Sequence, residues 1–260
     1  MVKLSSIGDI VHTLPTLAAI RSALPEAEIS WAVERTSAEI LRNNPLLTRL
    51  IEVDTRSLRR KSVLGKTIMT ARKQLRNLRA SDFDLAIDFQ GLIKSASISR
   101  FSGARYRAGF DKPFLREPSS RHLYTRTFKV EPGIHVIQQN LQLAAKAIGD
   151  FTNREDFSLE NERLSFPVFT GPSDIRNAKA LVDSTDGEFA ILNPAGGWAT
   201  KLWSAENYGK LADRLWSDHG ISSLICTAPF EKPLAERAIA ASESGRVRLV
   251  HPPLKEFFEL

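Results

Sequence analysis

The chain has 260 residues, which predicts one large domain or two small ones. Apolar residues make up 42% and charged residues 25%, a composition typical of a globular protein. The net charge of +6 suits an anionic partner. Its single cysteine, Cys226, excludes an intrachain disulfide framework, and no Cys/His spacing matches a zinc site. With no apolar signal segment at its start and no run near the roughly 20 apolar residues of a membrane span, we expect a cytoplasmic protein that touches a membrane only from its surface.

Short apolar runs alternate with helical patterns along the first part of the chain, which predicts an α/β fold. Strands are expected at residues 2–5, 27–33, 50–53, 85–88 and 105–109. Helices are expected at residues 10–24, 39–43, 62–80, 94–101 and 135–147. Residues 150–175 are polar and carry few signs of regular structure, so we place the linker there and predict domains at 1–165 and 166–260.

A second alternation of strands and helices follows the predicted linker. Strands are expected at 189–192, 222–226 and 247–250, and helices at 205–218, 233–241 and from 254 onward. An open parallel sheet usually has more strands than these, so we expect the second domain to be incomplete.

A basic segment lies between Thr55 and Ser81, where no acidic residue occurs. Its nine basic residues are Arg56, Arg59, Arg60, Lys61, Lys66, Arg72, Lys73, Arg76 and Arg79. Apolar residues at helical spacing run through the same stretch, so the pattern predicts an amphipathic basic helix. Such a helix is either a solvated face or a surface that lies on an anionic membrane.

The first candidate site is the run Ser5-Ser6-Ile7-Gly8-Asp9, between a predicted strand and a predicted helix. In open α/β sheets, ligands bind beyond the carboxyl ends of the strands, so Asp9 is expected to point into a crevice. Its carboxylate could accept the proton of an attacking hydroxyl. It could equally cap the helix, and spacing alone leaves both interpretations open.

Three more polar side chains follow at predicted turns and loops. Gln90 and Lys94 come after the strand at 85–88 and could hold hydroxyls or phosphate, although an ordinary turn with a solvated lysine fits the spacing better. Arg116 lies in a predicted loop and could bind a carboxylate or phosphate through two N–H groups, or be a plain surface arginine.

The loop from Asn193 to Ser204 follows the first strand of the second domain and precedes a helix. Its small residues expose backbone N–H groups near a helix N-terminus, which favours a phosphate. The alternative is a plain glycine turn, which fits less well because Thr200 and Lys201 accompany the glycines. Lys201 adds a positive charge beside Gly196 and Gly197. Glu231, after the strand that ends at Cys226, could bind a ribose hydroxyl or cap a helix.

Together these stretches resemble the heptosyltransferase I group of glycosyltransferase family 9. The matching runs are SSIGDIVHTLP at 5–15, DFQGLIKSA at 88–96, LREPSSRHLY at 115–124 and the loop at 196–203. The resemblance implies a GT-B fold, with two Rossmann-like domains facing a cleft. It implies inverting transfer of L-glycero-D-manno-heptose from ADP-heptose to the Kdo residue of Kdo-lipid A, in the inner core of lipopolysaccharide. The sequence shows no metal-ligand cluster, and we expect no metal, no cofactor and no nucleic acid partner.

The resemblance also implies a role for each candidate residue. Asp9 would be the catalytic base. An ADP-heptose donor site in the second domain would consist of Gly196, Gly197, Thr200, Lys201 and Glu231. An acceptor site in the first domain would consist of Arg56, Gln90, Lys94 and Arg116. With this acceptor, the basic segment is expected to lie on the cytoplasmic face of the inner membrane.

The sequence departs from the family pattern at two places, and three alternative functions accompany this interpretation. The family's D-T-G-x-x-H-L motif does not occur, so we expect a chain truncated at its C-terminus. The apolar run before Ser5 is also shorter than the family's. One rival is heptosyltransferase II or another family-9 enzyme, and a second is an inactive fragment that binds sugar nucleotide or lipid A. A third alternative is a dinucleotide oxidoreductase. It would need the G-x-G-x-x-G fingerprint after the first strand of a domain, and this fingerprint follows the first strand of neither predicted domain.

Overall fold

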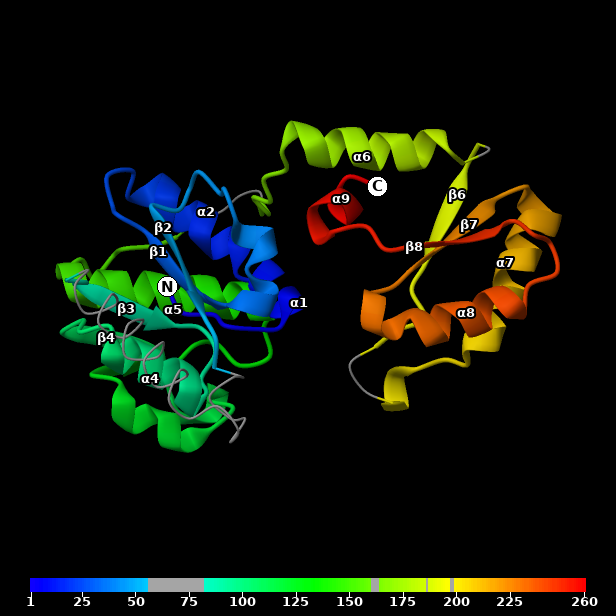
Figure 1. Cartoon of the computed structure of the whole chain (residues 1–260). Helices are drawn as coiled ribbons and strands as arrows, with labels where there is room; N and C mark the ends of the chain where they lie inside the picture. Colours follow the sequence, from blue (N-terminus) through cyan, green and yellow to red (C-terminus); the bar gives the residue numbers. More distant parts are fainter. Residues whose placement is uncertain (56–81, 160–163, 186, 197–198) are drawn as a thin grey trace, which may run out of the picture. The chain divides into compact units, whose positions relative to one another are not determined.

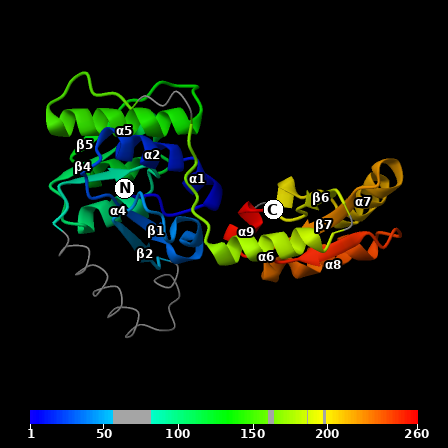
Figure 2. The same cartoon turned by 90° about the horizontal axis from the view of Figure 1, so that it is seen from above.

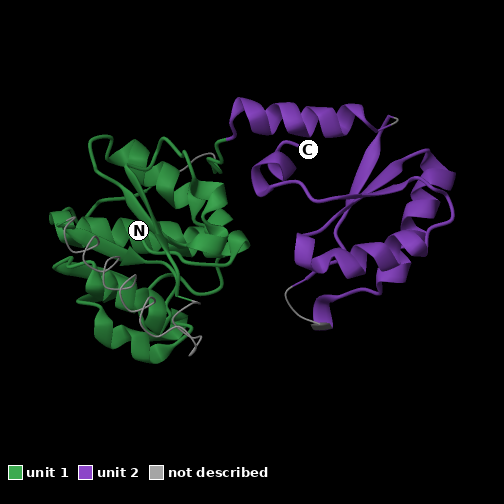
Figure 3. Cartoon of the chain, in the orientation of Figure 1, with its two compact units in different colours: residues 1–169 green, residues 170–260 purple. Residues whose placement is uncertain are grey.

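The computed structural model describes residues 1–55, 82–159, 164–185, 187–196 and 199–260 (Figure 1). The chain divides into two compact units, Met1–Phe169 and Thr170–Leu260 (Figure 3). This division lies close to the boundary that we placed at 165/166. Most of the basic segment and the helix predicted at 62–80 lie outside the described residues.

The first unit is an α/β unit whose described strands all pair in parallel. Its strands are β1 (Ser30–Glu34), β2 (Arg49–Val53), β3 (Leu85–Asp88), β4 (Tyr106–Phe110) and β5 (Arg126–Phe128). Its helices are α1 (Ile7–Val11), α2 (Leu14–Ala23), α4 (Ile93–Phe101) and α5 (Val136–Thr152). Short 3-10 turns are η1 (Arg35–Ser37), η2 (Glu39–Leu41), η4 (Lys112–Phe114) and η5 (Pro118–Leu123).

The first four residues lie between β1 and β3 and act as a central strand. Val2 bridges Ala32 on one side and Asp88 on the other, both in parallel. Backbone bonds from Val2 N to Ile87 O (2.8 Å) and from Lys3 N to Ala32 O (3.2 Å) hold this segment in place. The spatial order is therefore β2, β1, first segment, β3, β4, β5, which is that of doubly wound dinucleotide-binding folds.

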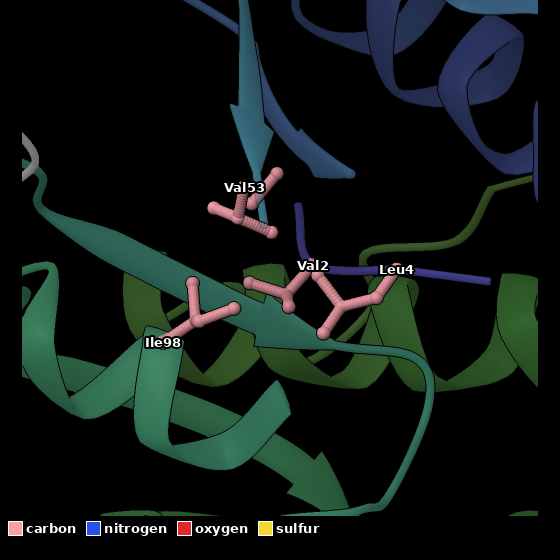
Figure 4. Packing of buried hydrophobic residues seen from close by; sticks show 5 residues of the cluster. Val2, Leu4, Val53 and Ile98 are labelled. Carbon is pink, nitrogen blue, oxygen red and sulfur yellow. The ribbon is translucent and has the colours of Figure 1, made fainter. Parts of the chain in front are cut away.

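Helices cover both faces of this sheet. In Figure 2, α2 and α5 lie on one side and α4 on the other. The buried side chains of Val2, Leu4, Val53 and Ile98 form a cluster with Ala32 that joins the first segment and β1–β2 to α4 (Figure 4). This packing holds the first segment against β1, β2 and α4, and so positions the loop that follows the first segment.

The helix that we predicted at 10–24 is two helices in the structure. Val11 ends α1 and Leu14 begins α2, with Pro15 in the first turn of α2. Proline has no N–H to donate to the carbonyl four residues earlier, so the helix cannot run continuously past Val11. The break leaves α1 as a short helix that carries Asp9 near its start.

The second unit contains a sheet of three parallel strands in the order β6-β7-β8. Its strands are β6 (Phe189–Leu192), β7 (Ser222–Cys226) and β8 (Val247–Val250). Its helices are α6 (Pro172–Asp183), α7 (Ala205–His219), α8 (Lys232–Ala240) and α9 (Leu254–Phe258), with 3-10 turns η6 (Ala199–Lys201) and η7 (Pro229–Glu231). The cysteine, Cys226, is buried in β7, as expected.

Two features of the second unit have clear local causes. A Cβ atom on Gly209 would stand 2.3 Å from Ala238 O, so glycine lets α7 and α8 pack backbone to backbone. Helix α6 falls partly in the stretch that we expected to be irregular. Its signals were Pro172 in the first turn and Asp174, whose carboxylate accepts from Gly171 N at 2.7 Å.

Candidate functional site

The first candidate site lies where the order of the first sheet reverses. The first segment and β3 are neighbours, but the chain leaves them toward opposite sides of the sheet order, to β1 and to β4 respectively. In such sheets a crevice for ligands opens beyond the carboxyl ends of these two strands. The runs at 5–9 and 89–93 begin at those two ends, so the fold brings the first two candidate motifs to one place.

Asp9 is the central side chain of this site. Its Oδ2 accepts from Ser6 N (3.0 Å) and from Ser6 Oγ (3.2 Å), as a residue in the first turn of a capped helix does. Its Oδ1 lies 3.2 Å from the Arg116 guanidinium. Capping therefore engages one carboxylate oxygen, and the other points toward the positive charge of a distant loop.

The electrostatic surroundings keep Asp9 ionised. Burial by itself raises the pKa of this carboxyl, but the Ser6 N–H bond and the charges of Lys3 and Arg116 outweigh it and hold the pKa below its ordinary 3.8. At neutral pH the group is a carboxylate, able to accept a proton and unable to donate one.

Arg116 reaches Asp9 because its loop is fastened to the turn after β3. Glu117 N donates to Gly91 O at 3.0 Å, and Ile93 N donates to the Glu117 carboxylate at 2.6 Å. Gly91 has a φ of +68°, and a Cβ there would lie 3.1 Å from Leu115 Cδ2. A glycine is thus required where the two loops meet. The Arg116 side chain remains 57% exposed and available to a ligand.

The other predicted acceptor residues have different surroundings. Lys94 is half-buried in the first turn of α4. Gln90 is 4% exposed, and its carboxamide bonds the backbone of the first segment. Arg56 lies outside the described residues. The acceptor contacts of all three remain predictions.

Two buried charged residues behind Asp9 were not singled out from the sequence. Lys3 is 3% exposed and donates to Phe89 O at 2.8 Å, while burial lowers its pKa and the charge of Asp9 opposes that shift. Asp88 is fully buried, which raises its pKa against the hydrogen bonds that it accepts from Tyr124 and Ser95. The available signal was a lysine inside the apolar run Val2-Lys3-Leu4 and an aspartate ending a buried strand.

The second candidate site lies at the carboxyl edge of the second sheet. Leu192 pairs with Ile225 near the ends of β6 and β7, so the loops that follow these strands leave from one edge. Thr200 and Lys201 end the first loop in η6, with both side chains exposed, and an added Cβ on Gly196 would lie 3.9 Å from Lys201 Cβ. Gly197 lies outside the described residues. Within the described part of this loop, the exposed Lys201 places a cation close to Gly196, a combination that suits a phosphate.

Glu231 stands in the loop after β7. Its carboxylate accepts from Ala228 N at 2.9 Å, so it closes the turn η7 at the start of α8. The capping alternative is therefore present, and one carboxylate oxygen is still available for a hydroxyl. Two neighbours were not predicted: Phe230, with 83% of its surface exposed, and His251, whose Nδ1 lies 2.7 Å from Thr227 O.

Within the described part of the chain, no three His, Cys, Asp or Glu side chains gather as metal ligands. Among the helices of that part, none has the length and apolar character needed to cross a membrane.

Comparison with known proteins assigns the sequence to a family. The model of glycosyltransferase family 9 (heptosyltransferase) matches residues 71–255. Lipopolysaccharide heptosyltransferase 1 of Pseudomonas aeruginosa is 31% identical over 253 residues, which are 95% of this chain and 66% of that protein. The protein of the same name from Escherichia coli K12 is 31% identical over 240 residues, 91% of this chain and 70% of that protein. The chain spans about two thirds of the length of these relatives.

Solved structures agree with this assignment. The E. coli heptosyltransferase WaaC with ADP-2-deoxy-2-fluoro heptose matches with a TM-score of 0.78 and 26% identity, covering 99% of this chain and 78% of that chain. E. coli ADP-heptose lps heptosyltransferase II matches with a TM-score of 0.73 and 17% identity, covering 100% of this chain and 74% of that chain, which supports the fold alone. These likenesses confirm the α/β class and the GT-B fold that the resemblance implied.

Proposed function

Because this chain belongs to glycosyltransferase family 9, we propose that the full-length gene product is a heptosyltransferase of lipopolysaccharide inner-core synthesis. The observation that carries the proposal is the ionised Asp9 at the sheet's switch point, with Arg116 at 3.2 Å. This pair offers a proton acceptor and an anion-binding cation at one place. Two matching structures hold ADP or an ADP-heptose analogue, which supports a nucleotide-sugar donor here.

The proposed acceptor is the Kdo residue of Kdo-lipid A. Kdo carries a carboxylate, and the Arg116 guanidinium is a suitable partner because it is largely exposed and can bind two oxygens at once. Lys94, in the first turn of α4, would add a second cation. In this arrangement the acceptor's anion replaces Asp9 as the partner of Arg116, and the Asp9 carboxylate becomes free to face the attacking hydroxyl.

The proposed reaction is a direct displacement with inversion at the heptose anomeric carbon. Asp9 takes the proton of the Kdo hydroxyl as its oxygen bonds to the anomeric carbon. The bond from that carbon to the diphosphate breaks, and ADP leaves with the electron pair. Lys201 and the backbone N–H groups near Gly196 would stabilise the negative charge that develops on ADP, and Glu231 would bind the nucleoside.

We further propose that the protein works on the cytoplasmic face of the inner membrane. The support is the charge pattern of the basic segment, which has nine cations and no acidic residue between Thr55 and Ser81. Each Lys or Arg close to an anionic lipid surface contributes about 1 kcal/mol to binding. A phosphorylated lipid A is such a surface.

The test is heptose transfer by the purified full-length gene product, with ADP-heptose and Kdo-lipid A, read by mass spectrometry of the lipid. The expected product is Kdo-lipid A with one added heptose. The Asp9→Asn variant should lose roughly 100-fold or more in turnover, because it cannot accept the proton, while ADP affinity stays unchanged. Asp218→Asn, at an exposed helical ion pair, is the control.

Three outcomes would contradict the proposal. Donor binding without transfer would favour a sugar-nucleotide-binding protein without activity. Transfer only to an acceptor that already carries a heptose would favour the activity of a heptosyltransferase II. Near-normal turnover of Asp9→Asn would remove Asp9 from the role of base.

A further inference from the structure

A cluster of buried polar side chains lies directly behind the first site. Lys3, Asp88 and Gln90 are 3%, 0% and 4% exposed, and all three stand at the carboxyl ends of the first segment and β3. Burying such groups costs free energy unless hydrogen bonds replace water. The hydrogen bonds of these three side chains identify the backbone segments that the cluster keeps in place.

Gln90 connects two neighbouring strands just beyond the point where their regular pairing ends. Its Oε1 accepts from Leu4 N at 2.7 Å, and its Nε2 donates to Ser5 O at 2.8 Å. These backbone groups begin the loop that carries Ser6 and Asp9. The carboxamide therefore fixes the direction in which the chain enters α1.

The backbone of Gln90 is itself held by Asp88. The Asp88 Oδ1 accepts from Gln90 N at 2.8 Å, and Oδ2 accepts from Ser95 Oγ and Tyr124 OH, both at 2.7 Å. The bonds from Ser95 and Tyr124 anchor the turn to α4 and to the end of η5. The turn cannot shift without breaking bonds in the interior.

The same turn also holds the loop of Arg116. Gly91 O, one residue after Gln90, accepts from Glu117 N at 3.0 Å and from Ser120 Oγ at 3.4 Å. The turn at 88–91 is thus bonded on one side to the loop that leads to Asp9 and on the other to the loop that carries Arg116. The two residues are 107 positions apart in the chain, and this turn is the structure that their loops share.

We propose that Gln90 is a positioning residue, which acts through the Leu4–Ser5 backbone to hold Asp9 against Ser6 N–H and opposite Arg116. The expected effect of Gln90 on kcat rests on the proposed function. Its expected effect on the position of Asp9 rests on the hydrogen bonds alone. This role differs from the acceptor contact predicted from the sequence, because the carboxamide oxygen and nitrogen of Gln90 are both engaged by backbone.

The structural test is the pKa of the Asp9 carboxyl, measured by NMR titration of its side-chain carbon, with the signal assigned through Asp9→Asn. Charged and hydrogen-bonding groups face Asp9 from the first segment (Lys3), from its own helix cap (Ser6) and from the loop of Arg116. In Gln90→Leu these contacts loosen, so the Asp9 pKa should rise toward 3.8. Gln90→Asn, which is too short to reach Leu4 and Ser5, should give the same rise if Gln90→Leu does not fold.

The matched control is Gln142→Leu, which removes a carboxamide that accepts from Glu131 N at 2.8 Å on α5. It should leave the Asp9 pKa unchanged. In the transfer assay, Gln90→Leu should reduce kcat about tenfold or more with little change in acceptor KM, since a misplaced base slows the chemical step. The control should keep both constants.

Two results would overturn the inference. One is an unchanged Asp9 pKa in folded Gln90→Leu and Gln90→Asn. The other is a raised acceptor KM with unchanged kcat, which would return Gln90 to an acceptor contact. The titration requires no turnover, so a failure of the proposed function, seen as no transfer by the unaltered protein, is distinguishable from a failure of this inference.

Discussion

Replacing Arg116 by Gln should have little effect on the stability of the protein and a large effect on acceptor binding at the first site. The guanidinium lies 3.2 Å from Asp9 Oδ1, but 57% of the Arg116 side chain and 19% of the Asp9 side chain are exposed. Ion pairs this accessible contribute about 0–1 kcal/mol. The free energy of unfolding should therefore fall by less than about 1 kcal/mol, and Tm by less than about 4 °C for a chain of this size.

The effect on acceptor binding should be larger. A charge-assisted hydrogen bond from guanidinium to a carboxylate or phosphate contributes about 1.5–3 kcal/mol, which converts to about 10- to 150-fold in affinity. We expect this loss in acceptor KM, measured with Kdo-lipid A in detergent, together with unchanged ADP affinity by calorimetry. The matched control is Arg121→Gln, which removes a guanidinium of η5 that lies 3.8 Å from the Asp111 carboxylate and should retain the acceptor KM.

The pH dependence gives an independent readout of the same change. Arg116 is one of the charges that hold the Asp9 pKa below 3.8, so its removal should raise that pKa and move the acidic limb of kcat/KM to higher pH. A Tm loss well above 4 °C would show that Arg116 is structural. An unchanged acceptor KM with an unchanged acidic limb would refute both its role in acceptor binding and its contact with Asp9.

Three other predictions concern the donor site, the second unit and the membrane. Lys201→Ala should weaken ADP-heptose binding by about 1.5–3 kcal/mol in calorimetry, because a charge-assisted contact to the diphosphate is lost, and unchanged affinity would place the diphosphate elsewhere. Burial alone raises the pKa of Asp213, but hydrogen bonds from Ser242, Glu243 and Ser244 lower it to about 2. The ionised Asp213 therefore stabilises the folded protein fully above pH 3.8, and this contribution disappears as the pH falls toward 2. Asp213→Asn should accordingly reduce Tm at neutral pH and leave it unchanged at pH 2. A variant of the basic segment replaces Lys66, Arg72, Lys73 and Arg76 with Gln. It should co-sediment less than the unaltered protein with lipid A vesicles at low salt. Equal binding by the two proteins would show that the segment is only a solvated face.

The sequence by itself determined the class of fold, most of the elements and the family. Apolar periodicity is a local property, so β6, β7 and β8 lie where the pattern predicted them. Glycine, proline and small polar residues mark the strand ends, which located Asp9 and the loop of Lys201. The elements that were missed, α6 and β5, are ones whose local patterns are weak or fall in polar stretches.

Only the tertiary structure decided which of these side chains meet. The Asp9–Arg116 pair spans 107 positions, and the bonds of Gln90 to Leu4 and Ser5 span 86 and 85. Such contacts depend on the first segment lying between β1 and β3, a neighbour relation that no local pattern encodes. The charge state of Asp9 depends on the same relation, because burial and the facing cations are set by strands and loops far apart in the sequence.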